Sequence, residues 1–158
     1  MRERFGFDLG FIESSHMKET GISEKISFHD SVITGIEITK ENLCFSLSHV
    51  DVLKDNPLNN SNMGKKTDGA NLLLHGFKIE SIIKLMANGN EQVFAVECFL
   101  ELLDEIVNGE INSLENISDS EIEILIIGSN QPIVLKIKYC AMTLTWGNYV
   151  GKAWFENL

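Results

Sequence analysis

Two histidine–aspartate pairs are the residues of this 158-residue chain whose types and spacing could do chemistry. His29 and Asp30 are adjacent, and one residue separates His49 from Asp51. Imidazole and carboxylate groups bind divalent metals, and residues i and i+2 of a strand point to the same side of a sheet. One hypothesis is therefore a small-ligand-binding or metal-binding domain, or a hydrolase, that uses His29, Asp30, His49 and Asp51.

A structural interpretation of the same pairs competes with this hypothesis. Metal sites need several converging ligands, and neither His16 nor His75 stands at a ligand spacing from the pairs. An aspartate at the entrance of a strand commonly bonds to the neighbouring backbone instead. The sequence also contains no G-x-S-x-G turn and no phosphate-binding P-loop. We therefore predict no catalytic residue, no metal, no cofactor and a protein that is not an enzyme.

The elements that would position these pairs form a β-hairpin. Apolar residues alternate with polar ones in residues 32–38 and again in residues 43–47, and a short polar turn separates the two stretches. This period of two is typical of paired strands with one buried face. His29-Asp30 would lie at the entrance of the first strand, and His49 and Asp51 would lie just beyond the second.

The rest of the chain predicts a mainly β fold, or α+β at most. Residues 121–127, 133–139 and 142–146 alternate, and a slip of one position at Cys140-Ala141 indicates a bulge or corner. Residues 96–107 show helical spacing that ends at Gly109, although Asn108-Gly109 could instead close a hairpin. We expect an antiparallel sandwich or partly open barrel of about six to eight strands with one short helix.

The chain is short enough to form a single domain over residues 1–158. Within residues 1–27, the alternation from Phe5 to Phe11 suits a short strand, and residues 13–25 are polar enough for a loop or one helical turn. Residues 55–69 carry Pro57, two glycines and four asparagines, so we expect a long surface loop there that is mobile rather than functional.

The formal net charge of −10 is concentrated in one stretch. Residues 85–135 contain no lysine, arginine or histidine, whereas the 13 acids outside this stretch are balanced by the 13 lysines and arginines. The stretch holds ten acids, namely Glu91, Glu97, Glu101, Asp104, Glu105, Glu110, Glu115, Asp119, Glu121 and Glu123. An acidic surface repels nucleic acid and anionic membranes and attracts basic partners, although it also simply aids solubility.

A protein partner, basic in character, is therefore predicted, with no nucleic acid and no membrane. Aromatic residues gather near the end of the chain, and aromatic anchors beside acids are typical of binding surfaces, although core packing is the alternative. The candidate partner-binding residues are Glu97, Glu101, Asp104, Glu105, Glu110, Glu115, Trp146 and Tyr149. Three widely spaced cysteines and the lack of a secretory signal indicate a cytoplasmic protein.

The runs FHDSVITGIEIT, NLCFSLSHVDVL and ANLLLHGFKI, followed by TLTWGNYVGKAWFE, resemble a family of small bacterial β-rich domains. Some of those domains are similar to immunity proteins that accompany polymorphic toxins. The resemblance covers residues 28–155, excludes residues 1–27 and implies no catalytic residue. It favours a non-enzymatic binding domain, an immunity protein that neutralises a basic toxin through its acidic surface. A structural subunit of a homo-oligomer is a further hypothesis.

Overall fold

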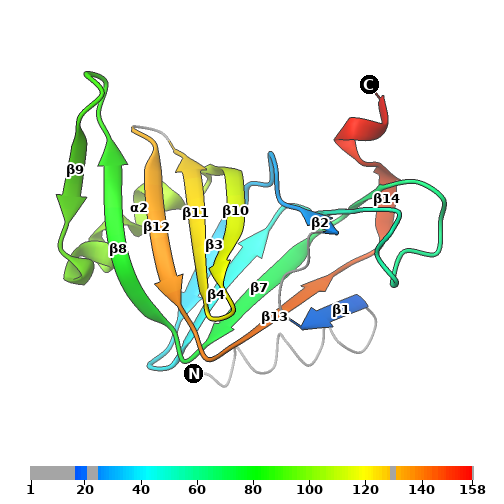
Figure 1. Cartoon of the computed structure of the whole chain (residues 1–158), viewed down its shortest axis with the longest axis horizontal. Helices are drawn as coiled ribbons and strands as arrows, with labels where there is room; N and C mark the ends of the chain where they lie inside the picture. The colour runs from blue at the N-terminus through cyan, green and yellow to red at the C-terminus, as the bar shows by residue number, and fades with distance from the viewer. Residues whose placement is uncertain (1–16, 21–24, 129–130, 158) are drawn as a thin grey trace.

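A computed structural model describes residues 17–20, 25–128 and 131–157 of the chain. Within these residues the strands form three antiparallel sheets (Figure 1). The first sheet contains the hairpin predicted over residues 32–47, whose arms pair from Ile33 opposite Leu47 to Ile38 opposite Leu43. In order across this sheet, the strands are β1 (Met17–Thr20), β13 (Ala141–Trp146), β7 (Ala70–His75), β4 (Asn42–Leu47) and β3 (Ile33–Ile38).

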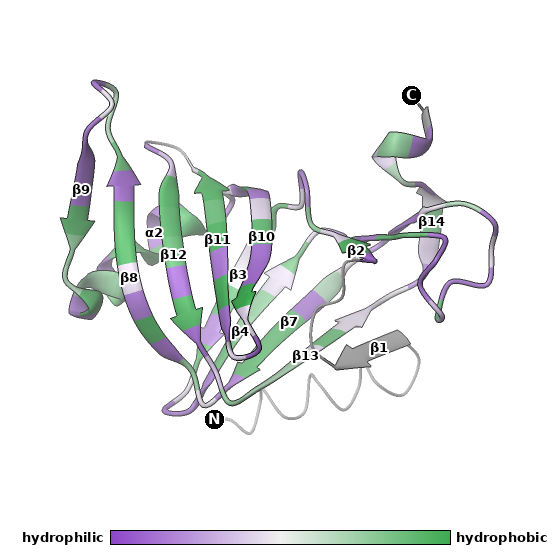
Figure 2. Ribbon diagram, in the orientation of Figure 1, coloured by the Kyte–Doolittle hydropathy of each residue, from purple (hydrophilic) through white to green (hydrophobic). Residues whose placement is uncertain are grey.

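The second sheet has one buried face and one solvent-facing face. Hydrophobic stretches and hydrophilic residues follow one another along β11, β12 and β8, as the bands in Figure 2 show. On β11, Ile122, Ile124 and Ile126 are fully buried, whereas the residues between them are partly exposed. In order across this sheet, the strands are β10 (Glu110–Ser118), β11 (Glu121–Ile127), β12 (Ile133–Lys138), β8 (Lys78–Leu85) and β9 (Glu91–Phe94).

The third sheet is small and lies beside the carboxy-terminal turn, on the right of Figure 1. Its strands are β14 (Tyr149–Lys152), β6 (Lys65–Thr67), β5 (Asp51–Val52) and β2 (Ile26–Ser27), in that order. The short helical segments are η1 (Val96–Leu102), α2 (Leu103–Ile106) and η2 (Trp154–Asn157). None of the helices in the described residues is long and apolar enough to cross a membrane.

Two corners fold the second sheet over the first. β7 leads into β8 at Gly76, and β12 leads into β13 at Cys140, whose N–H donates to the His75 carbonyl at 2.8 Å. Gly76 has a φ of 66°, and a Cβ atom there would overlap the Cys140 sulfur, so the corner needs glycine. An isolated bridge between Val32 and Glu110 links the two sheets again on the far side of the core.

One hydrophobic cluster fills the space between the sheets. Leu72, Leu144 and Trp146 come from the first sheet, and Ile82 and Leu135 come from the second; all five are fully buried. The segment η1–α2 lies against the inner face of the second sheet, because its Phe99, Leu102 and Ile106 belong to the same cluster. The prediction of a β-rich antiparallel sandwich with one short helix is confirmed.

The predictions for residues 96–107 and 140–141 are also confirmed. Residues 96–106 are helical, and the chain leaves the helix through Asn108, which has a φ of 74°. Asn108-Gly109 therefore ends a helix and does not close a hairpin. The slip at Cys140-Ala141 is the corner between β12 and β13.

Some predictions need correction. Residues 17–20 form the edge strand β1 and not a loop, because the partner β13 supplies the pairing that the polar sequence MKET does not reveal. The described residues form fourteen strands, more than the predicted six to eight, since several are only two to four residues long. The predicted loop of residues 55–69 contains the strand β6. The strand predicted from Phe5 to Phe11 lies outside the described residues.

Candidate functional site

The two histidine–aspartate pairs meet at one end of the third sheet. His29 and Asp30 form a tight turn before β3, in which Asp30 has a φ of 67° and the Ser31 N–H donates to the Phe28 carbonyl. His29 Nε2 lies 3.4 Å from Asp30 Oδ1, and His29 Nδ1 lies 3.1 Å from the Asn112 carbonyl oxygen. Because a carbonyl only accepts, Nδ1 must carry a proton. These bonds give the pair a role in closing the turn against β10.

Asp51 is the buried member of the group. Its side chain is only 1% exposed, and neither carboxylate oxygen has a hydrogen-bond partner within the described residues. Burial raises the pKa of Asp51 from 3.8 to about 6, the nearby Asp30 adds to this, and Lys66 and His29 oppose it. A buried carboxyl without a partner is costly, and such groups cluster at functional sites.

His49 is buried beside Asp51 and is held by serine hydroxyls. Its Nδ1 lies 3.0 Å from Ser48 Oγ, and its carbonyl accepts a hydrogen bond of 2.6 Å from Ser31 Oγ. Burial lowers the pKa of His49, and the charge of Lys66 lowers it further. Within the described residues, however, no three side chains of His, Cys, Asp or Glu are arranged to hold a metal ion.

A groove of about 330 Å³ opens beside His29. One wall consists of residues 112–115 on β10, and the other consists of residues 26–29 with Leu53 and Phe155. The η2 turn borders this groove, since the Trp154 ring lies 5.2 Å from the His29 ring and Phe155 packs edge-on against Trp154. The Gly64 N–H anchors the same turn by donating to Glu156 Oε2 at 2.7 Å.

The terminal aromatic residues lie in three different environments. Trp146 is completely buried in the core and offers no surface to a partner. Tyr149 is half-buried and donates a hydrogen bond of 3.3 Å from its hydroxyl to the Leu58 carbonyl. Trp154 is 44% exposed, so it has the accessibility that a binding anchor requires; it belongs to the aromatic group near the end of the chain but was not among the candidate partner-binding residues.

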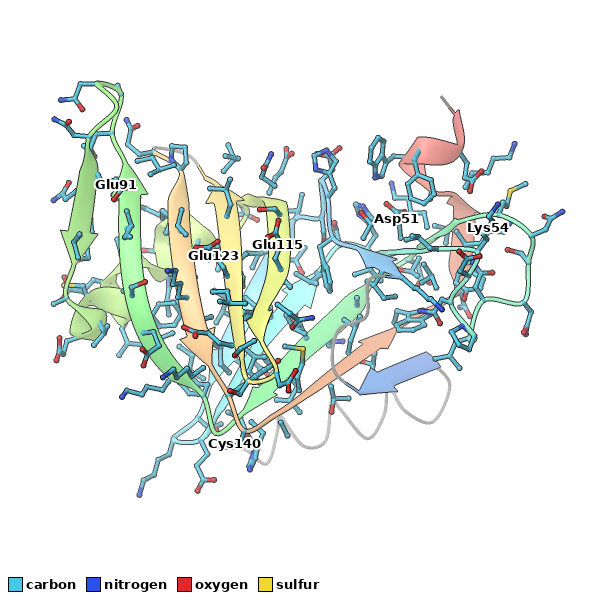
Figure 3. The ribbon with its side chains drawn as sticks, in the orientation of Figure 1. Asp51, Lys54, Glu91, Glu115, Glu123 and Cys140 are labelled. Atoms are coloured by element: carbon cyan, nitrogen blue, oxygen red, sulfur yellow. The ribbon has the colours of Figure 1, made fainter. Side chains whose placement is uncertain are left out.

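The candidate acids lie on two sides of the second sheet. Glu110 and Glu115 are exposed on β10. Glu97, Glu101 and Asp104 are exposed on η1–α2, which packs against the inner face. Figure 3 shows Glu91, Glu123 and Glu115 spread across the second sheet from β9 to β10, and Asp51 apart from them, towards η2. The structure thus does not gather the predicted partner-binding residues on a single face.

Lysines outside the base-free stretch partly neutralise it. In the ladder between β11 and β12, Glu121 lies opposite Lys138 and Glu123 lies opposite Lys136. Glu105 contacts Lys84, whose Nζ lies 3.0 Å from Oε1 at hydrogen-bond geometry and 2.8 Å from Oε2. Within the described residues, strand pairing or an ion pair therefore places a base beside these three acids, a feature that sequence order alone conceals.

An apolar row crosses the solvent-facing side of the second sheet. Leu125, Val134, Ile83 and Val93 occupy facing positions on β11, β12, β8 and β9. Val93 is 72% exposed, and the other three side chains are half-buried. We call these four residues the apolar row. The alternation of residues 121–127 and 133–138 places Leu125 and Val134 on the outer face, but the pairing that aligns the row is not visible in the sequence.

Comparison of the chain with family models, with curated protein sequences and with solved structures gives no match.

Proposed function

We propose that the protein is a non-enzymatic binding domain that takes up a basic protein on the outer face of its second sheet. The apolar row is the observation that carries this proposal, because soluble proteins seldom leave a contiguous apolar surface exposed unless it contacts a partner. Interfaces commonly have an apolar centre and a polar rim.

The charge around the row supports a basic partner. Glu91, Glu110 and Glu115 are exposed on the two edge strands of the sheet, β9, which carries the Val93 end of the row, and β10, which lies beyond its Leu125 end. Acidic side chains at the rim of an interface speed association with a cationic protein and disfavour anionic ones. Neutralisation of a basic toxin domain, the role of an immunity protein, fits this chemistry and is the form of the function that we favour.

Capture of partners from the native host, followed by a salt titration, tests the proposal. We expect a basic partner whose affinity falls as salt rises, since rim charges are screened. Val93→Lys should weaken binding by about tenfold or more, because it places a charge on the most exposed side chain of the apolar row. Leu100→Lys is the matched control, since Leu100 is 65% exposed but lies on η1 at the inner side.

Three results would contradict the proposal: a partner that is not basic, binding that is indifferent to salt, or greater loss of binding with Leu100→Lys than with Val93→Lys. Sizing of the purified protein addresses the homo-oligomer hypothesis directly. The net charge of −10 per chain opposes self-association at low salt.

A further inference from the structure

A cleft of about 340 Å³ lies at one end of the first sheet, where β4 ends, β7 begins and β13 ends. The polar side chains of Ser46, Asp68 and Asn71 line it, together with the backbone of Gly69 and Gly147. It shares no lining residue with the groove at the η2 turn. Small-molecule sites commonly combine a cavity of this size with a few polar groups that fix the orientation of the ligand.

The Asn71 side chain is the hydrogen-bond donor of this cleft. Asn71 on β7 lies directly opposite Ser46 on β4, so the pairing of the two strands holds both residues in place. The Ser46 hydroxyl donates to Asn71 Oδ1 at 3.2 Å, which leaves the amide nitrogen with two hydrogens to donate. Within the part of the chain that the structure describes, no other hydrogen bond involves this amide. A ligand in the cleft could therefore accept a hydrogen bond from Asn71.

The Asp68 side chain is the hydrogen-bond acceptor. It is exposed, and among the described residues its carboxylate has neither a hydrogen bond nor an ion pair. The carboxylate lies against Gly147, because a Cβ atom there would overlap Asp68 Oδ1. Two backbone bonds hold these loops together: the Asp68 N–H donates to the Asn148 carbonyl at 2.9 Å, and the Gly147 N–H donates to the Gly69 carbonyl at 3.0 Å. The carboxylate is thus kept at the cleft by a close approach that glycine allows.

The combination of one acceptor and one donor indicates the chemistry of the ligand. A hydroxyl group both donates and accepts, so one hydroxyl or two neighbouring ones can satisfy the Asp68 carboxylate and the Asn71 amide together. An ammonium group only donates and would leave the Asn71 amide without an acceptor. An anion would be repelled by Asp68. The polar groups of the cleft therefore favour a neutral molecule that carries several hydroxyls.

We propose that this cleft binds a neutral sugar, whose hydroxyls donate to the Asp68 carboxylate and accept from the Asn71 amide. The side chains of Leu47, Ala70 and Trp146 also line the cleft and supply the apolar surface that the C–H groups of a sugar ring need. The site belongs to the first sheet, whereas the apolar row lies on the second. It is therefore independent of the proposed function.

Amide NMR of the full chain is the measurement, and glucose, galactose, mannose and N-acetylglucosamine, each at about 50 mM, are the probes. At least one of these sugars should shift the backbone amides of residues 68–71 and the side-chain amide of Asn71, with a dissociation constant of about 1–10 mM. Methylammonium chloride and sodium acetate at the same concentration test a cationic and an anionic ligand, and neither should shift these amides.

Two variants test the residues. Asp68→Asn keeps the shape of an exposed side chain and should weaken sugar binding by about tenfold or more, because it removes a charged acceptor. Gly147→Ala removes no polar group but displaces the Asp68 carboxylate, so it should also weaken binding by about tenfold. The matched controls are Asp55→Asn, an exposed acid outside the cleft, and Gly151→Ala, where a Cβ atom meets nothing within 4 Å. Both controls should change affinity by less than about twofold.

Several outcomes would overturn the sugar site. These are no shift with any of the four sugars at about 50 mM, shifts that lie outside the cleft, full affinity in Asp68→Asn, or shifts at the cleft with methylammonium or acetate instead of a sugar. Val93→Lys should leave sugar binding unchanged, because Val93 lies on β9 of the second sheet. Equal loss of sugar binding in Val93→Lys and Asp68→Asn would likewise contradict the assignment to this cleft.

Discussion

Glu123 lies directly opposite Lys136 in the ladder between β11 and β12, although Lys136 is the residue that ends the base-free stretch of the sequence. The hairpin that returns from β11 to β12 brings this lysine opposite Glu123, the last acid of the stretch. On its other side Glu123 faces Glu115. The charge of this surface therefore depends on strand register as much as on composition.

Lys136→Glu should destabilise the protein because it creates a row of three facing acids. Facing like charges cost up to about 1 kcal/mol each relative to a neutral pair, so we expect the free energy of unfolding to fall by about 1–2 kcal/mol. Urea denaturation at low and high salt measures this, and the loss should shrink at high salt. Lys40→Glu, an exposed change in the β3–β4 turn, is the control. A loss of equal size in both variants would contradict the prediction.

Lys84 and Glu105 fasten the segment η1–α2 to β8 by an ion pair that is shielded from water. The Lys84 side chain is 13% exposed and the Glu105 side chain is 24% exposed. Lys84→Met should lower the free energy of unfolding by about 2–3 kcal/mol, because it leaves a carboxylate largely buried without its base. Thermal and urea unfolding of the variant measure the loss.

The double variant Lys84→Met with Glu105→Leu is the control for this pair. Replacing both charges with apolar side chains of similar size is often neutral, so most of the lost stability should return. If the double variant is as unstable as Lys84→Met, the lost stability comes from the contact of the Lys84 ammonium with the Phe94 ring and not from its pair with Glu105. The Nζ atom lies 5.4 Å from the centre of that ring.

Asn59 holds the turn that precedes β6. Its buried amide donates to the carbonyl oxygens of Val52, Leu53 and Met63 at 2.9, 3.2 and 3.0 Å, and its Oδ1 accepts from the Ser61 N–H at 2.9 Å. Asn59→Ala should destabilise the protein by about 2–3 kcal/mol, since buried carbonyls lose their donor. Limited proteolysis should cut residues 55–64 faster in this variant. Asn60→Ala, an exposed neighbour, should change neither measurement.

The sequence predicted those elements whose residues alternate and bury one side. The β3–β4 hairpin, β11 and β12 follow directly from this pattern, because each contributes a continuous set of side chains to the core. The strands β1, β2, β5 and β6 could not be predicted in this way. They are two to four residues long and depend on partners that are distant in the sequence.

The candidate sites, too, combine features that the sequence predicted with features that it could not predict. Spacing predicted that His49 and Asp51 share one side of a strand, but the strand β5 begins only at Asp51, and Val50 and Val52 are as buried as the predicted pair, so burial does not distinguish the two sides. No spacing could predict that the Asp51 carboxylate would lack a partner, since this depends on the environment that the third sheet and the turn at Asp30 create. The apolar row likewise arises only when four strands are aligned in register.

Asp51→Asn should stabilise the protein at neutral pH and lose this advantage in acid. The pKa of Asp51 is raised to about 6 in the folded protein, chiefly by burial, whereas the ordinary value is 3.8. The folded state therefore binds the proton more tightly, and stability falls as the pH rises from about 4 to 6. Above pH 6 Asp51 is ionised in the folded protein, and the loss in the free energy of unfolding that this causes reaches its full value. That value is about 3 kcal/mol at most, since one pKa unit corresponds to about 1.4 kcal/mol.

Denaturant unfolding of both proteins between about pH 4 and pH 7 measures the difference. The gain in the free energy of unfolding from Asp51→Asn should be largest at about pH 7. It should decline towards pH 4, where the parent carboxyl is protonated and burying it no longer costs the energy of a buried charge. Because the pKa of His49 is lowered in the folded protein, acid destabilises the fold through this residue. His49 is present in both proteins, so its effect cancels in the difference between them. Asp55→Asn, an exposed carboxyl four residues away, should give no pH-dependent gain. If the gain is the same at every pH, the Asp51 carboxylate has hydrogen-bond partners in solution. The interpretation of Asp51 as a buried charge without a partner would then be wrong.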